Sequence, residues 1–433
     1  MALRRLSVGA ICVGVVAVVA LLAFAWQPAL PPIDYSAAAG PAAADQIARG
    51  AILASAGNCA ACHTDKGGTP FAGGYPIPTP FGTIYSTNIT PDRDTGIGAW
   101  SLAAFTRAMR EGVARDGRHL FPAFPYDHFA KLTDADIGAL YAYLMSLPAT
   151  QAETPANTMP FPFDIRALQA VWRATFVVDG PFQPDPAKSA EWNRGAYLAE
   201  GLAHCGACHT MRNVFGAEER GHPYGGAPIE GWAAWPLDVS PSPARWTKQD
   251  FFTYLRGGTT VHGRALGPMG PVIRALAPLP DADIEAIAAY FADLNRPQSA
   301  TPEATAWQTM ERARNIRAAP EDEAGERLYL SVCGSCHGGL RSKSATVAEL
   351  PLSTALWSDK PHNFMLTVLD GVGAATDAPG PTMPPFRQSL TNDQIILIEN
   401  YLRHTWLHLP GWPYKPIAIE RLRADPTSLP WIR

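Results

Sequence analysis

The stretches Cys59-Ala60-Ala61-Cys62-His63, Cys205-Gly206-Ala207-Cys208-His209 and Cys333-Gly334-Ser335-Cys336-His337 repeat one pattern along the chain. Two residues between the cysteines place both sulfur atoms on one helical turn, and a histidine follows directly. The pattern is typical of covalent haem attachment, in which the thiols bond to the porphyrin and the histidine binds the iron. We therefore expect three covalently bound haem c groups, with iron ligands from His63, His209 and His337.

Zinc sites and redox dithiols also use paired cysteines. A zinc site needs two pairs converging on one metal, whereas each pair here lies in its own repeat. A redox dithiol gives no role to the histidine that follows each pair. The remaining cysteine, Cys12, lies in an apolar segment, so no cysteine is left for a disulfide framework.

Each motif belongs to a longer repeat. A short helical segment leads into the motif, a Gly/Pro-rich loop follows it, and a second helix is predicted at Trp100-Ser101, Trp246-Thr247 and Trp357-Ser358. An amphipathic helix closes each repeat, after Leu132, Leu279 and Leu390. This organisation predicts an all-α fold of three consecutive class I cytochrome c domains.

The expected domain boundaries follow from the motif spacing and from proline-rich stretches. We expect a membrane anchor (1–27), cytochrome domain 1 (40–150), a linker helix (151–186), domain 2 (187–297), a linker (298–320), domain 3 (321–410) and a C-terminal docking tail (411–433). Trp406, Trp412 and Trp431 among prolines suggest that the end of the chain docks on a partner or a membrane interface.

Near the N-terminus, Arg4 and Arg5 are followed by an uncharged run from Leu6 to Ala25. About 20 apolar residues are enough for a helix across a bilayer, so a transmembrane helix with a cytoplasmic N-terminus is expected. A cleaved signal peptide ending near Ala23-Phe24-Ala25 is the alternative. Either interpretation places the haem domains in the periplasm, at the inner membrane of a bacterium.

The sixth iron ligand of such a domain is usually a methionine before the closing helix. Met269 and Met383 occupy such positions in Pro/Gly loops of the second and third repeats. In the first repeat Phe124 stands where methionine is expected, so another ligand is needed. His128 is preferred, His119 is second, and Met109 or Met145 fit helical core positions better. A second imidazole should lower the potential of that haem.

Other function classes find little support. Only 17% of residues are charged and the formal net charge is −4, which excludes the basic surface that nucleic acid requires. No nucleophile–base pair, phosphate-binding loop or paired carboxylate stands out. By itself the chain is interpreted as non-catalytic.

The three motifs, the loop Phe121–Phe129, the segment Phe161–Arg166 and the Trp-led helices resemble the triheme cytochrome c subunits of membrane-bound bacterial dehydrogenases. The resemblance implies a catalytic partner and electron transfer to ubiquinone or a terminal oxidase. Phe124 in place of methionine and an N-terminal helix in place of a cleaved signal make the chain more similar to the subunits of molybdenum-containing aldehyde or isoquinoline-type dehydrogenases. The partners of those subunits are a molybdopterin subunit and a small 2Fe-2S subunit. The alternative family member serves an alcohol dehydrogenase that carries pyrroloquinoline quinone (PQQ). A stand-alone haem enzyme with an open first iron is a hypothesis of another class.

Overall fold

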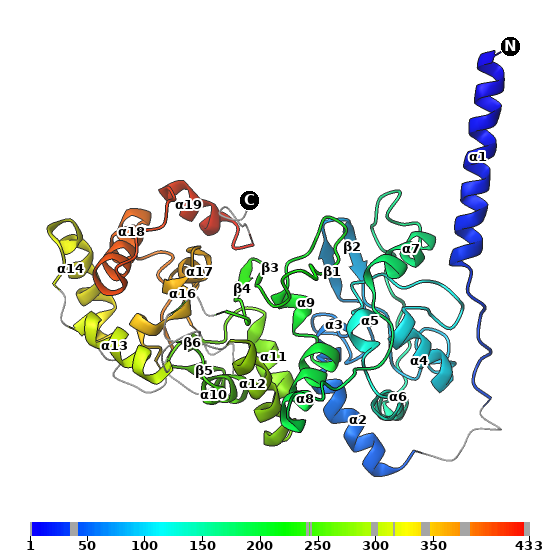
Figure 1. Cartoon of the computed structure of the whole chain (residues 1–433), viewed down its shortest axis with the longest axis horizontal. Helices are drawn as coiled ribbons and strands as arrows, with labels where there is room; N and C mark the ends of the chain where they lie inside the picture. The colour runs from blue at the N-terminus through cyan, green and yellow to red at the C-terminus, as the bar shows by residue number, and fades with distance from the viewer. Residues whose placement is uncertain are drawn as a thin grey trace. The chain divides into compact units, whose positions relative to one another are not determined.

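The computed structural model describes residues 2–34, 42–239, 242, 245–295, 302–314, 317–338, 347–372 and 382–427. It divides into two compact units (Figure 1). Unit 1 comprises Met1–Asp185 and Tyr197–His204, and unit 2 comprises Pro186–Ala196 and Cys205–Arg433. The first predicted cytochrome domain therefore lies in unit 1, and most of the second and all of the third lie in unit 2.

Unit 1 contains mainly helices, with one hairpin. Its elements are α1 (Ala2–Ala25), α2 (Ala44–Ala56), α3 (Cys59–Cys62), β1 (Pro76–Thr79), β2 (Gly82–Tyr85), α4 (Leu102–Glu111), α5 (Tyr126–Phe129), α6 (Asp134–Ser146), α7 (Ala167–Phe176) and the π-helix η1 (Leu198–Leu202). α2 packs on α6, and α1 ends beside α7.

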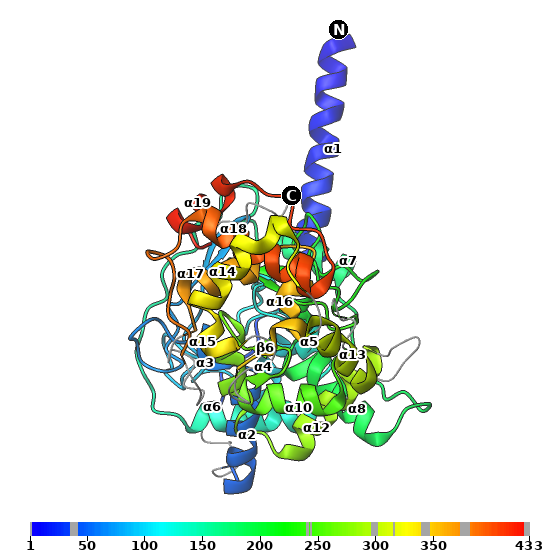
Figure 2. The same cartoon turned by 90° about the vertical axis from the view of Figure 1, so that its left-hand side faces the viewer.

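Unit 2 holds the elements of the second and third repeats. The second has α8 (Ala190–Tyr197), α9 (Gly206–His209), β3 (Ala227–Ile229), β4 (Trp232–Ala234), α10 (Lys248–Gly257), β5 (Thr259–Thr260), β6 (Gly263–Arg264), α11 (Met269–Leu276) and α12 (Asp281–Leu294). The third has α13 (Pro302–Arg314), η2 (Pro320–Asp322), α14 (Glu323–Val332), α15 (Gly334–His337), η3 (Leu350–Leu352), α16 (Thr354–Trp357), α17 (His362–Asp370), α18 (Asn392–Asn400), η5 (Tyr401–Leu407) and α19 (Pro416–Ala424). α14 lies against α18, as Figure 2 shows.

One helix crossing recurs in all three repeats. The helix before each haem motif carries a glycine, and a Cβ at any of the three would overlap a carbonyl oxygen of the closing helix. The pairs are Gly50 with Ala139, Gly195 with Ala286 and Gly325 with Leu397. The backbones approach so closely there that only glycine fits.

The Trp-led helices follow the prediction in two repeats. The side chains of Ser101 and Thr247 cap α4 and α10, and left-handed glycines, Gly112 and Gly258, end them. In the third repeat the prediction is wrong: Trp357 ends α16, and the long helix α17 starts only at His362. Pro361 explains the shift, because the residue before a proline is disfavoured in a helix.

The all-α expectation also needs correction. The described residues contain three antiparallel two-stranded sheets, β1–β2, β3–β4 and β5–β6. Each strand pair closes through a tight turn, and Gly231 at φ +80° in the turn of β3–β4 adopts a conformation that favours glycine. The Gly/Pro-rich loops thus form short hairpins between the helices.

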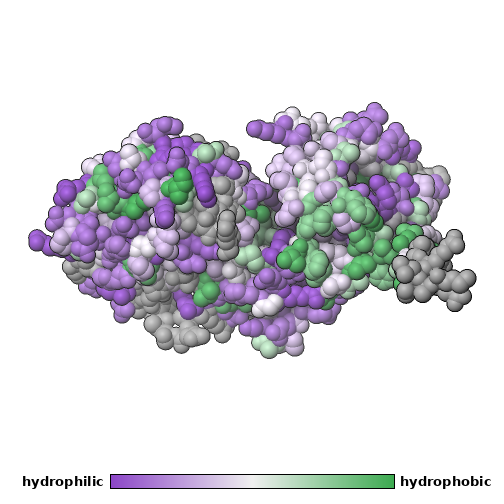
Figure 3. Space-filling view, turned by 90° about the horizontal axis from the view of Figure 1, so that it is seen from above, coloured by the Kyte–Doolittle hydropathy of each residue, from purple (hydrophilic) through white to green (hydrophobic). Residues whose placement is uncertain are grey.

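The prediction of a transmembrane helix also needs correction. Within the residues that the structure describes, no helix is both long enough and apolar enough to span a lipid bilayer. At the end of α1, Ala25 is buried, and its carbonyl accepts a hydrogen bond from His119 Nε2 at 2.8 Å. In Figure 3 apolar residues gather on part of the surface. Among the described residues, α1 exposes Val19 and Phe24, and α7 exposes Val171.

The C-terminal stretch packs largely on its own unit. Trp406 and Trp412 are buried, at 4% and 6% exposure, in a core that also contains Tyr329 and Met365. Trp431 lies outside the described residues. The docking role of 411–433 stays a prediction.

Candidate haem-binding sites

The attachment cysteines lie on or beside three short helices, α3, α9 and α15. Burial, reinforced by the second cysteine of each motif, raises the pKa of Cys59 and Cys205 to about 12 and that of Cys333 to about 11. Reactive dithiols and zinc ligands need a lowered pKa, because the thiolate is the active form. The raised pKa keeps these thiols protonated at neutral pH in the absence of a bound group.

Two of the motif histidines are held by main-chain carbonyls. His63 Nδ1 lies 2.7 Å from the Thr87 oxygen, and His209 Nδ1 lies 2.7 Å from the Trp235 oxygen. With Nδ1 as the donor, Nε2 is the acceptor nitrogen, which is the tautomer that binds a metal. Each carbonyl lies just after a hairpin, so β1–β2 and β3–β4 orient the two rings.

The third motif histidine is arranged less tightly. His337 Nδ1 is buried and has no hydrogen-bond partner in the described part of the chain, although the Ala348 carbonyl is close enough to raise the pKa of the ring. Burial has the larger effect and lowers the pKa of His337, as it does for His63 and His209. A lowered pKa favours the neutral ring, which is the form that binds a metal.

Of the two predicted methionines, Met383 lies in a loop as expected, whereas Met269 is the first residue of a helix. Met269 is half-buried and starts α11. Met383 is half-buried and forms a two-way backbone pair with Val372, with N–O distances of 2.9 Å in both directions. Met365, in contrast, is fully buried in the core. Binding of iron by Met269 and Met383 stays a prediction.

The backbone register shows which residue replaces methionine in the first repeat. Leu120 N donates to the Gly112 carbonyl at 2.7 Å, and Ala265 N donates to the Gly258 carbonyl at 2.7 Å. Gly112 and Gly258 both end the Trp-led helix, so Leu120 and Ala265 are equivalent. Four residues further along lie Phe124 and Met269. Phe124 therefore stands in the place of the methionine.

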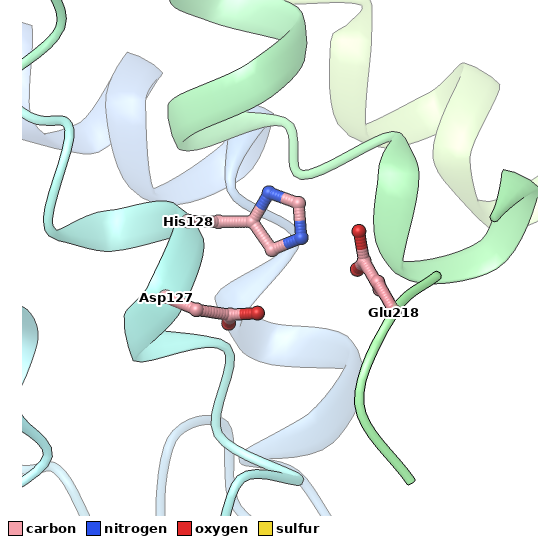
Figure 4. A group of neighbouring side chains, drawn as sticks. All are labelled: Asp127, His128 and Glu218. Atoms are coloured by element: carbon pink, nitrogen blue, oxygen red, sulfur yellow. The ribbon is translucent and has the colours of Figure 1, made fainter. Parts of the chain in front are cut away.

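The two candidate histidines of unit 1 are both buried. His128 Nδ1 lies 2.7 Å from the Glu200 carbonyl, which leaves Nε2 as the acceptor nitrogen. His119 uses Nε2 for the Ala25 carbonyl, so its tautomer is the opposite one. Figure 4 shows His128 and Asp127 side by side on α5. The geometry favours His128 over His119, and Met109 is buried on α4.

Sequence reasoning found the cysteines, histidines and methionines but missed the groups that orient them. The orienting atoms are main-chain carbonyls of Thr87, Trp235 and Glu200. A main-chain oxygen carries no side-chain signal, so only the fold reveals it. Together these residues fit haem c, whose iron supplies a one-electron redox couple when bound.

Two family models match parts of the chain. The family model for cytochrome c matches residues 47–148, and that for subunit III of cbb3-type cytochrome c oxidase matches residues 320–402. The fructose dehydrogenase cytochrome subunit of Gluconobacter japonicus is 38% identical, covering 82% of this chain and 78% of that protein. The gluconate 2-dehydrogenase cytochrome c subunit of Pantoea cypripedii is also 38% identical, covering 87% and 89%. The chain belongs to the family of cytochrome c subunits of bacterial dehydrogenases.

This dehydrogenase cytochrome subunit is also similar to a much longer protein. A nicotinate dehydrogenase subunit of Pseudomonas putida is 44% identical over 94% of this chain. The chain spans only about a third of that relative, 34% of its length. Membership in the family confirms the resemblance noted from the motifs and supports a role in electron transfer.

Proposed function

We propose that this cytochrome subunit carries three haem c groups and passes electrons from a catalytic dehydrogenase partner to the respiratory chain. The observation that carries this proposal is the Cys-x-x-Cys-His motif in all three repeats, whose histidine has a lowered pKa in each and is aligned by a main-chain carbonyl in two. A histidine that binds a metal through one ring nitrogen usually donates a hydrogen bond from the other nitrogen, and this bond fixes the tautomer. Two of the three motif histidines have such a bond to a main-chain carbonyl.

The partner is proposed to be a molybdenum enzyme that oxidises an aldehyde or a nitrogen heterocycle, with a 2Fe-2S subunit between it and the haems. Two observations support this choice: Phe124 replaces the methionine, and the identity to the nicotinate dehydrogenase subunit reaches 44%. A PQQ-dependent alcohol dehydrogenase is the alternative, supported by the 34% identity to the alcohol dehydrogenase cytochrome c subunit of Komagataeibacter europaeus.

The proposed electron acceptor is ubiquinone, and the proposed location is the bacterial periplasm. Fractionation of cells by osmotic shock tests the location: haem-stained protein in the cytoplasmic fraction would refute it. Reduction of a water-soluble ubiquinone by the pre-reduced complex tests the acceptor, and a slow, unsaturable rate would refute that choice.

Haem content tests the core of the proposal. Mass spectrometry of the full chain should show an added mass of three haem groups, and replacing both cysteines of one motif with alanine should remove one of them. Fewer than three in the unaltered chain would overturn the proposal.

Electron transfer itself is tested with the partner present. The co-purified complex should reduce its haems on addition of an aldehyde or a nitrogen heterocycle, and ethanol should do so if the alternative partner is correct. A high-spin, cyanide-reactive first haem in the isolated chain would instead favour the stand-alone haem enzyme.

A further inference from the structure

We propose that Asn363 is a positioning residue that fixes the second haem site relative to the third, so that electrons pass directly between these two haems. This inference rests on the proposed function, because it needs a haem at both motifs. It concerns residues of unit 2 alone.

Asn363 joins the two repeats through a paired hydrogen bond. Its Nδ2 donates to the carbonyl of Ala233 at 2.8 Å, and the Ala233 N–H donates to its Oδ1 at 2.9 Å. The amide therefore pairs with a residue of β4 as a neighbouring strand would. Asn363 is 8% exposed, so loss of either bond would leave a buried polar group without a partner.

The neighbouring residues strengthen this junction. His362 is fully buried, and its Nε2 contacts the carbonyl of Gly231 in the turn of the same hairpin. Trp232, which follows, packs against the core of the third repeat. Three consecutive residues of the hairpin, Gly231 to Ala233, are thus held by the third repeat.

A second contact joins the same repeats at another place. The Glu349 N–H donates to the Val261 carbonyl, and the Thr354 N–H donates to the His262 carbonyl, both at 3.0 Å. His262 is buried and stacks on Trp246. Two separate junctions restrict rotation of one repeat about the other.

The first junction lies on a continuous path between predicted iron ligands. His209, in the second motif, is bonded to the Trp235 carbonyl, two residues after Ala233. Asn363 lies on α17, and two residues after the end of α17 Val372 pairs with Met383, the predicted ligand of the third iron. The predicted iron ligands His209 and Met383 are therefore connected by hydrogen bonds, one hairpin and α17.

This frame has a direct consequence for electron transfer. Electron exchange between two fixed centres falls steeply as their separation grows, so a rigid frame keeps the rate high and uniform. Loosening the Asn363 pair should broaden the distribution of separations and slow the exchange, while leaving the haem of unit 1 unaffected.

The test uses the full, haem-loaded chain. Asn363→Leu removes both hydrogen bonds, and Asn363→Asp keeps the acceptor but loses the donor to the Ala233 carbonyl. Pulsed electron paramagnetic resonance measures dipolar coupling between the ferric haems, and a Cys59→Ala/Cys62→Ala background, which lacks the first haem, leaves only the coupling of the second haem to the third. Flash photoreduction measures the rate of electron exchange between the second and third haems.

The expected result is a weaker, broader coupling and a slower exchange in Asn363→Leu, with a smaller change of the same kind in Asn363→Asp. Hydrogen exchange at the Ala233 amide should accelerate by about tenfold or more. The matched control is Thr367→Val on the same helix, because Thr367 Oγ1 donates to the Asn363 carbonyl within α17 and to no other group among the described residues. That variant should leave the coupling unchanged.

Two results would overturn the inference. The first is a dipolar coupling and an electron-exchange rate that are unaltered in both Asn363 variants, although the amide hydrogen of Ala233 exchanges faster. The second is an equal effect from Thr367→Val. A chain with fewer than three haems would instead refute the proposed function, so the two failures are distinguishable.

Discussion

At the scale of single residues, Asp136 is a carboxylate of unit 1 that accepts several hydrogen bonds. Its side chain is 2% exposed, and it accepts bonds from Arg49 at 2.5 and 2.9 Å and from Tyr197 at 2.5 Å. Asp136→Asn keeps the shape but loses the charge that these donors face. We expect a loss of about 1–3 kcal/mol in the free energy of unfolding, measured by denaturant titration of the haem-loaded chain.

The second repeat offers a matched control. Asp283 is bonded to Arg194 in the same way, at 2.7 and 2.9 Å, but its side chain is 16% exposed. Because water can solvate the pair, Asp283→Asn should cost less, on the order of 1 kcal/mol or below. Equal losses in the two variants would contradict the assigned importance of burial.

At the scale of elements, the crossing of α8 and α12 depends on Gly195. A methyl group there would overlap the carbonyl oxygen of Ala286 on α12, and a backbone atom cannot move aside cheaply. Gly195→Ala should therefore destabilise unit 2 by about 1–3 kcal/mol, the usual cost of overpacking. Thermal melting followed by circular dichroism measures the effect.

The control for that substitution is Gly221→Ala, because nothing lies within 4 Å of a Cβ at Gly221. Its melting temperature should stay within a degree or two of the unaltered chain. A similar loss in both variants would show that the crossing does not require glycine.

The C-terminal segment is held on α18 by a buried carboxyl group. Burial, opposed by the Trp412 N–H and by Arg403, raises the pKa of Glu399 to about 7. An unfolded glutamate titrates near 4.3, so between about pH 4.3 and 7 the unfolded chain releases its proton first. This contribution to stability is complete below that window, falls as the pH rises through it, and levels off above pH 7.

Glu399→Gln removes this dependence. Relative to the unaltered chain, the variant should gain roughly 1–3 kcal/mol between pH 5 and pH 8, measured as the difference in the free energy of unfolding. The exposed Glu420 on α19 is the site of a matched Glu→Gln control. A flat difference for Glu399→Gln would disprove the assignment.

The elements also show where sequence reasoning succeeds. The haem motifs, the closing helices and the capping residue Thr247 follow from local chemistry, because attachment spacing and capping act within a few residues. The hairpins and the start of α17 were missed, since short strands are stabilised by contacts such as Asn363 with Ala233, 130 residues apart in sequence. The expected membrane span over Leu6–Ala25 was wrong, because no helix among the described residues is both long enough and apolar enough.

At the scale of the whole molecule, the chain passes from unit 1 to unit 2 and returns. Residues 186–196 belong to unit 2, 197–204 to unit 1, and Cys205 onward to unit 2. Glu200, in the returning segment, supplies the carbonyl that orients His128, and its side chain bonds Lys131 at 2.9 Å. The segment that leads into the second haem motif therefore shapes the first site.

This arrangement predicts unequal haems. If His128 binds the first iron, two imidazoles make that haem the lowest in potential, because methionine is the ligand that raises it. His128→Met should raise only the lowest of three midpoint potentials, by on the order of 0.1 V, in a spectroelectrochemical titration. Met383→His should have the opposite sign and lower a different potential. His119→Met should move none of the three, since the ring of His119 is turned to the Ala25 carbonyl. A shift on changing His119, with none on changing His128, would reverse the assignment and make His119 the ligand.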